Sequence, residues 1–327
     1  MTENPENGGT EAAASLSVYI TGGATPLSLA VARHLTDAGH SVAGWVGTAD
    51  EANALRAVGG LPVYGDPSRS ALVADHLTLA EVDTVVHLMP QTLNVPTPLT
   101  DMNWAKAAEQ LVAQTETLVT AIEQVGTVKH FVTSSFAFLY ADAADPVAED
   151  AATRTDGGDF IAAALTAEAA AIEAGAVVLR AGYPFSKGAD TPLHKIEKLL
   201  RRVPTPIYLG KPENTSNWVY ADDLAAAVFV ATTSEAEGIY NIAMDAHPSV
   251  PGFMAQLGAQ LGLALPPTAP PFVARGAMGK HYNQLLAPSV AVSSERAKSE
   301  LGWSPQYTDV EAALEEILLS WRAGEMA

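Results

Sequence analysis

Short apolar stretches alternate with longer amphipathic ones along the chain. Between the apolar stretches, hydrophobic side chains recur at helical spacing, as at Leu27, Val31 and Leu35, and a glycine such as Gly39 ends the segment. Apolar strands that alternate with helices predict an α/β fold, a doubly wound parallel sheet covered by helices on both faces. The predicted strands are 16–21, 41–46, 61–65, 82–89, 129–135, 176–182 and 238–243.

The composition changes outside the predicted sheet. Residues 183–221 are rich in Pro, Lys and Arg, and the chain from residue 246 onward is rich in Pro and Gly. We therefore predict a sheet domain made of 15–182 and 222–245. A small C-terminal substrate lobe, made of 183–221 and 246–327, should lie beyond the carboxyl ends of the strands, where parallel sheets bind ligands. The polar residues 1–14 predict a flexible tail.

The overall composition excludes several classes of protein. The 327 residues are 48% hydrophobic and 17% charged, as expected for a globular protein. The chain has no cysteine and its eight histidines are scattered, so we expect neither a disulfide nor a metal site. The net charge of −19 argues against binding to nucleic acid or to an anionic membrane. The acidic start lacks the features of a signal peptide, which predicts a cytoplasmic location.

The turn after the first predicted strand is the first candidate for ligand binding. Its sequence is TGGATPLS (21–28), and such a turn directs backbone N–H groups at an anion near the helix N-terminus. Gly22 and Gly23 are present, but the next glycine is Gly39, so the three-glycine dinucleotide fingerprint is incomplete. A plain tight turn into a helix is the alternative interpretation.

Eight segments occur together in a characteristic order. They are TGGATPLS (21–28), VYGDPSR (63–69), VDTVVHLM (82–89), HFVTSS followed by a tyrosine (130–140), VVLRAGYPFS (177–186), NWVYADDLAAAV (217–228), IYNIA (239–243) and LGWSPQY (301–307). This arrangement resembles the extended short-chain dehydrogenase/reductase family, the group similar to NAD-dependent epimerases and dehydratases. The resemblance covers residues 16 to 322 and implies a Rossmann-like fold that binds NAD or NADP.

The resemblance also assigns residues to a cofactor site. It places Asp66 near the adenine and Tyr183 beside the nicotinamide. Asp66 is alternatively a helix N-cap, and His87 is alternatively a core histidine. The predicted cofactor-binding residues are Gly22, Thr25, Ser28, Asp66, His87, Leu88, Met89, Ser134 and Arg180.

Several positions depart from the family pattern. Thr25 and Ser28 stand where the phosphate turn has its second and third glycines, which weakens pyrophosphate binding without excluding it. The family's Tyr-x-x-x-Lys pair, which handles the proton, falls on Phe160 and Ala164, which can neither give nor tune a proton. The family's Ser or Thr falls on Phe136, although Ser135 replaces it if the alignment shifts by one.

The segment after the second strand leaves the cofactor open. Binders of NAD usually place an acidic residue there, and binders of NADP an arginine. The strand ends in Val46, Gly47 and Thr48, and we interpret Asp50 and Glu51 as the start of a helix. The sequence therefore does not choose between NAD, NADP and neither.

Other residues are candidates for replacement chemistry. Tyr183 is a candidate general acid if Arg180 or Lys187 tunes its pKa; alternatively it is a packing tyrosine. His194 is a second titratable candidate, and alternatively it is a surface histidine. Seven of the 18 Lys and Arg residues fall between 180 and 211, so Lys187, Lys195 and Arg202 are predicted to face an anionic ligand, unless they form a solvated helix face. The pocket floor should be apolar, because it would be formed by Phe136, Phe138 and Phe160.

Three functions remain open from the sequence. The first is a protein with a nucleotide or small-molecule pocket that lacks Tyr/Lys hydride transfer and catalyses a non-redox step, if any. The second is an NAD(P)-dependent oxidoreductase or epimerase with substituted catalytic residues. The third is a non-enzymatic regulator that responds to a nucleotide. In each case we expect a homodimer through the helices at 103–125 and 158–174, the second of which is rich in alanine.

Overall fold

A seven-stranded parallel sheet forms the centre of the protein. The computed structural model describes residues 15–89, 104–188, 191–202, 213–263 and 288–323; the predicted tail lies outside these residues. The strand order is β3-β2-β1-β4-β5-β6-β9, and all neighbouring pairs are parallel. The strands are β1 (Ser17–Ile20), β2 (Ser41–Trp45), β3 (Leu61–Val63), β4 (Thr84–His87), β5 (His130–Phe136), β6 (Val177–Ala181) and β9 (Ile239–Ile242). The prediction of a doubly wound parallel sheet is confirmed.

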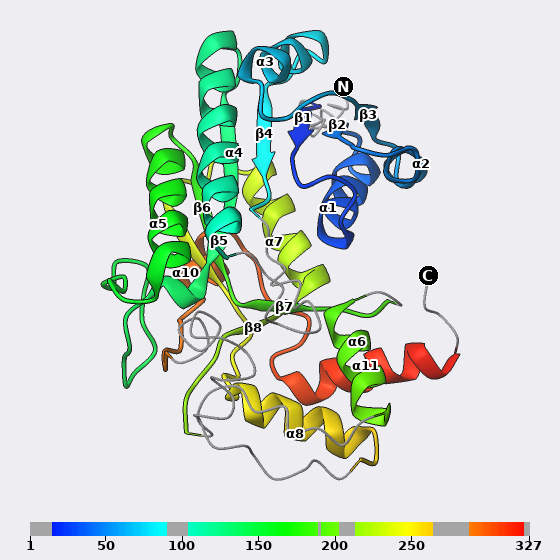
Figure 1. Ribbon diagram of the computed structural model, residues 1–327, viewed down its shortest axis with the longest axis vertical. Helices are drawn as coiled ribbons and strands as arrows, with labels where there is room; N and C mark the ends of the chain where they lie inside the picture. The colour runs from blue at the N-terminus through cyan, green and yellow to red at the C-terminus, as the bar shows by residue number, and fades with distance from the viewer. Residues whose placement is uncertain (1–14, 90–103, 189–190, 203–212, 264–287, 324–327) are drawn as a thin grey trace, which may run out of the picture.

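Helices cover both faces of this sheet (Figure 1). Val18 and Ile20 of β1 pack toward one layer, while Tyr19 between them packs toward the other, as the two-residue period of a strand requires. The first layer contains α1 (Pro26–Asp37), α2 (Ala49–Ala57), α7 (Ala221–Thr233) and α10 (Glu295–Glu300). The second contains α3 (Ser70–Leu79), α4 (Trp104–Val125) and α5 (Gly158–Glu173).

A second group of elements lies beyond the carboxyl ends of the strands (Figure 1). Its core is rich in aromatic residues, and the side chains of Trp218 and Phe253 stack with their ring centroids 4.0 Å apart. The elements are the short parallel pair β7 (Tyr183–Phe185) and β8 (Trp218–Tyr220), together with α6 (Pro192–Arg202), α8 (Val250–Gln260) and α11 (Val310–Ala323). A one-turn 3-10 helix, η2 (Ala137–Leu139), follows β5. The division into two lobes with the predicted limits remains a prediction.

Asp223, at the start of α7, forms hydrogen bonds with the segment that follows α10. Its side chain, 5% exposed, accepts a hydrogen bond from the Gln306 backbone N–H at 2.8 Å through Oδ1. Its backbone oxygen accepts one from the Trp303 indole at 2.9 Å. Burial raises the pKa of Asp223 from 3.8 to about 6, because few groups solvate the charged carboxylate.

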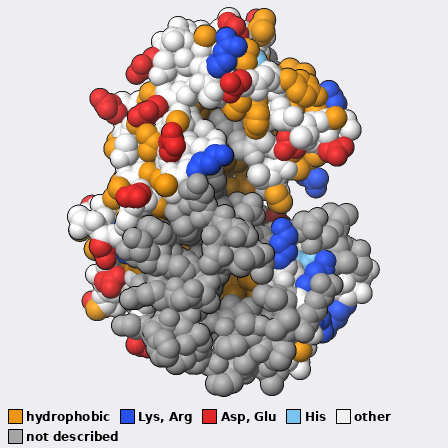
Figure 2. All heavy atoms as spheres, in the orientation of Figure 1, with side chains coloured by type: hydrophobic (Ala, Val, Ile, Leu, Met, Phe, Trp, Pro, Cys, Tyr) orange, Lys and Arg blue, Asp and Glu red, His pale blue; other side chains and the backbone are white. Residues whose placement is uncertain are grey.

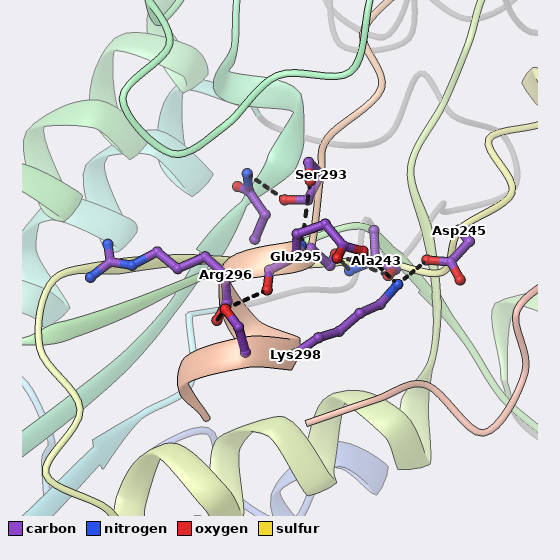
Figure 3. Close-up of polar contacts among 9 residues, drawn as sticks. Ala243, Asp245, Ser293, Glu295, Arg296 and Lys298 are labelled. Atoms are coloured by element: carbon purple, nitrogen blue, oxygen red, sulfur yellow. Dashed lines mark hydrogen bonds and ion pairs between the residues drawn. The ribbon is translucent and has the colours of Figure 1, made fainter. Parts of the chain in front are cut away.

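Side chains of α10 lie close to Ala243 and Asp245, just after β9 (Figure 3). Arg296 donates to the backbone oxygen of Ile239 at 2.9 Å, and its guanidinium lies over the Tyr240 ring. The backbone N–H of Asn241 donates to Glu149 Oε1 at 2.9 Å. Lys298 of the same short helix donates to the carboxylates of Asp245 and Glu295. These contacts attach α10 to the edge of the sheet.

Candidate functional site

The turn between β1 and α1 lies where the strand order reverses, between β1 and β4. Gly22 and Gly23 have φ angles of 97° and 63°, a region that side chains disfavour, so both positions favour glycine. Thr25 caps α1 by accepting from the Ser28 backbone N–H, and the buried Ser28 hydroxyl donates to the Gly23 backbone oxygen at 2.6 Å. The hydroxyls of Thr25 and Ser28 therefore both bond within the turn.

The end of β4 packs beneath this turn. A Cβ added to Gly22 would lie 3.4 Å from Leu88 Cβ, so the two residues are in close contact. Met89 is buried in the core that also holds Phe136 and Phe160. His87 is 2% exposed, and burial lowers its pKa to about 4, so the ring is neutral at physiological pH. Its Nδ1 lies 2.8 Å from Thr21 Oγ1 and its Nε2 lies 3.0 Å from Thr115 Oγ1, which agrees with a core histidine.

The ends of β2 and β3 form the opposite side of the turn. Glu51 is the third residue of α2, and its carboxylate accepts from the backbone N–H groups of Gly47 and Thr48, at 2.7 and 3.1 Å. The interpretation of this segment as a helix start is confirmed by that capping box. Asp66 is exposed and accepts from the backbone and hydroxyl of Ser68, which lower its pKa. It is not the N-cap of α3, which is Arg69.

Aromatic rings occupy the carboxyl end of β5. Phe160 of α5 lies 6.0 Å from Phe136 between ring centroids, and Phe136 stacks on Phe138 at 4.8 Å. Phe138 in turn stacks on Tyr183 at 5.7 Å, and Tyr183 lies 5.6 Å from Trp218. The expected apolar floor therefore extends from α5 to the aromatic core beneath α8.

A buried polar network lies beside these rings. The Ser135 hydroxyl donates to Glu168 Oε2 at 2.5 Å, and Arg180 binds both carboxylate oxygens of Glu168, at 3.1 and 2.5 Å. The Arg180 guanidinium also lies over the Tyr140 ring at 4.6 Å. Ser134, the neighbouring candidate, is fully buried in the same strand. Ser135 and Arg180 thus bond to Glu168 within the core.

Tyr183 of β7 lines a small pocket between η2, the end of β6 and the segment before β8. The cavity measures about 20 Å³, which is room for about one water molecule. Burial raises the pKa of Tyr183, and the positive charge of Arg154 opposes that rise. The cation acting on this phenol is therefore Arg154, where the sequence suggested Arg180 or Lys187. The pocket is lined by Ala137, Phe138, Ala181, Gly182, Tyr183, Thr215, Ser216, Asn217, Pro288 and Val290.

Comparison with known proteins identifies the family of the chain. The sequence model of the NAD dependent epimerase/dehydratase family matches residues 18–243. The chain belongs to this family. No curated protein matches it.

Several solved members of the same fold superpose on nearly the whole chain. WbmG from Bordetella bronchiseptica, in complex with NAD and UDP, has 18% sequence identity and a TM-score of 0.75, with 97% of each chain covered. The UDP-glucose 4-epimerase of Bifidobacterium longum, in complex with NAD⁺ and UDP, has 15% identity and a TM-score of 0.72, covering 95% of this chain and 99% of that one. At these identities the likeness shows the fold.

The nucleotide end of the site fits the cofactor of the family better than the reacting end does. At the nucleotide end, two glycines with positive φ leave the backbone of the turn uncovered above Leu88. At the end where the reaction is expected, Phe160 is buried and Ala164 is 0% exposed, and neither side chain carries a proton donor or a charge. Among the described residues, no group of His, Asp or Glu side chains could hold a metal ion. In the same part of the chain, no helix has the length and apolar character to cross a membrane.

Exposed cations lie on α6, within the predicted Lys- and Arg-rich segment 180–211. Lys195 and Lys198 are exposed, and Figure 2 shows Lys and Arg side chains gathered there, beside a hollow between the two parts of the molecule. The Lys187 Nζ atom lies 4.0 Å from Oε1 of Glu316. The side chain of Arg202 lies outside the described residues.

His194 differs from the surface residue that the sequence allowed. Its side chain is buried, and its ring lies 5.0 Å from the Trp321 ring. Trp321 belongs to α11, more than a hundred residues away in sequence, and therefore local periodicity could not place it against His194. Arg154 was missed for a similar reason, because the segment before α5 is irregular. Its only sequence signal is a lone basic residue among acidic ones.

Proposed function

We propose that this member of the epimerase/dehydratase family binds a nucleotide at the β1–α1 turn but does not carry out Tyr/Lys-assisted hydride transfer. The observation that carries the proposal is the burial of Phe160 and Ala164, the residues that the sequence resemblance assigns to the family's tyrosine and lysine positions. Phe160 packs on Phe136, so the space where a hydroxyl would approach a substrate holds a ring of hydrocarbon.

The physical reason lies in the proton that accompanies hydride transfer. Oxidising an alcohol or reducing a carbonyl requires a group that takes or gives a proton at the oxygen, and a nearby cation that tunes its pKa. The Ser135 hydroxyl on β5 donates to Glu168 in the core, and Ser135 is fully buried. The standard relay is therefore absent from its usual place among the described residues.

Tyr183 and Arg154 are the groups that support a different reaction. Tyr183 lines the pocket, and because burial raises its pKa the phenol stays protonated at neutral pH. A protonated phenol donates a hydrogen bond to a developing oxyanion without consuming a cofactor. We therefore propose a non-redox step, such as an isomerisation, cyclisation or elimination, on a small ligand that is apolar or anionic.

Neighbouring structures of the same fold support NAD as the first nucleotide to test, since several were solved in complex with it. The nucleotide would be held by the turn at Gly22 and Gly23. NADP remains the alternative, because no residue at the end of β2 selects between them.

The deciding experiment combines a titration with a designed gain of function. Calorimetry of nucleotide-stripped protein with NADH and with NADPH should show micromolar binding of at least one, and no NADH should be consumed with carbonyl or sugar-nucleotide substrates. The double variant Phe160→Tyr with Ala164→Lys should then create reductase activity. Wild-type turnover of NADH that is lost in Tyr183→Phe would instead establish an oxidoreductase with substituted residues.

A further inference from the structure

His87 joins the nucleotide turn to helix α4 across the point where the strand order reverses. One ring nitrogen is hydrogen-bonded to the hydroxyl of Thr21, the residue before Gly22. The other is hydrogen-bonded to the hydroxyl of Thr115, in the middle of α4. Thr115 is 0% exposed and lies 28 residues from His87 in sequence. The ring is therefore a direct link between two elements that do not adjoin along the chain.

The partners of Thr21 and Thr115 determine which atom donates the proton in each hydrogen bond of the His87 ring. The Leu88 backbone N–H donates to Thr21 Oγ1 at 3.0 Å, which leaves the hydroxyl proton of Thr21 to be donated to His87 Nδ1. At the other end the Thr115 hydroxyl donates to the Leu111 backbone oxygen at 3.0 Å, so its oxygen must accept from His87 Nε2–H. Each hydroxyl has a single proton, and hence only the neutral tautomer with its proton on Nε2 satisfies the whole chain.

We propose that His87, held as this tautomer, is a positioning residue that fixes the nucleotide turn relative to α4. This inference rests on the proposed nucleotide site. Thr21 sets the start of the turn, and Leu88, bonded to the Thr21 hydroxyl, supports Gly22 from below. A change at the α4 end therefore reaches the turn through two hydrogen bonds.

The consequence of breaking the far end follows from the same proton count. Without the Thr115 hydroxyl, His87 Nε2–H is buried with no acceptor, and the proton is better placed on Nδ1. Nδ1–H then faces Thr21, whose own proton loses its acceptor. The disturbance appears at the turn, although Thr115 itself lies on a helix of the opposite layer.

The test is the variant Thr115→Val, with Thr133→Val as a matched control. Thr133 is equally buried and its hydroxyl also lies near His87, but it donates to the His87 backbone oxygen at 3.2 Å and not to the ring. We expect Thr115→Val to weaken NADH binding about tenfold, the size of a typical coupling between connected sites, and Thr133→Val to change it by less than about twofold. Thr115→Ser, which keeps the hydroxyl, should restore wild-type affinity.

Nitrogen-15 NMR of the histidines in the unliganded protein gives a readout that does not depend on a nucleotide. Wild-type His87 should be neutral with its proton on Nε2, and Thr115→Val should shift the proton to Nδ1. Equal loss of affinity in the two valine variants, or an Nδ1–H tautomer in the wild type, overturns the proposal. If the folded wild type binds neither NADH nor NADPH, the nucleotide site itself is refuted, and the positioning role fails with it even where the tautomer is as expected.

Discussion

Replacing Asp223 by asparagine should stabilise the protein at neutral pH and change it little in mild acid. The carboxyl is buried at the start of α7 and accepts one backbone N–H, and no described group bonds to its second oxygen. Its pKa is raised from 3.8 to about 6 on folding, so the folded state binds more protons than the unfolded state between these values. The contribution of Asp223 to the free energy of unfolding is therefore largest below pH 4 and is lost as the pH rises to about 6.

The size of the effect follows from the shift. About two pKa units correspond to roughly 3 kcal/mol at 1.36 kcal/mol per unit. The exposed Gln306 beside the carboxyl admits solvent that screens part of this cost, so we expect about 1–2 kcal/mol. Asparagine retains an oxygen for the Gln306 N–H and carries no charge, and Asp223→Asn should recover that amount above pH 7.

Urea denaturation at pH 4.5 and pH 8 measures the difference between variant and wild type at each pH. Taking the difference removes the contribution of His87, whose pKa is lowered to about 4 and which therefore gives the opposite slope. Asp222→Asn, at the exposed neighbouring position, is the control and should give a much smaller gain. A variant that is equally stable relative to wild type at both pH values, or less stable at pH 8, would refute the reasoning.

Two further results are expected from the core and the surface. Glu168→Gln leaves the Arg180 guanidinium buried without its counter-charge and should lower the free energy of unfolding by about 3 kcal/mol, measured by urea denaturation; a loss no larger than in the exposed Glu173→Gln would contradict it. The predicted homodimer through α4 and α5 places Ile172, 44% exposed, near the interface, so Ile172→Glu should halve the mass measured by light scattering, whereas a monomeric wild type would rule the dimer out.

Much of the fold could be predicted because its signals are local. Each long strand of the sheet is a run of apolar residues with helical spacing on either side, and the sequence shows both. The pair β7 and β8 was missed because each strand has three residues and the partners are separated by more than thirty positions. Their pairing depends on the arrangement of the second lobe, which no local pattern records.

The candidate site could be predicted only in part, for a related reason. Motif order locates the turn at Gly22 and the family positions of Phe160 and Ala164, since these are fixed by spacing. It does not give the direction in which a side chain points. Arg180 is a case in point: the motif places it beside the cofactor, and the structure pairs it with Glu168 inside the core.

The coverage of the sheet edges has a consequence for how this chain behaves at high concentration. An open strand edge is a template on which another molecule can add a strand, which leads to fibrous aggregates. At one edge Arg296 and Glu149 already occupy the Ile239 oxygen and the Asn241 N–H that an incoming strand would need. At the other edge β3 is only three residues long and contains Pro62, which has no N–H to offer. Self-association by sheet extension is therefore disfavoured at both edges of the described sheet.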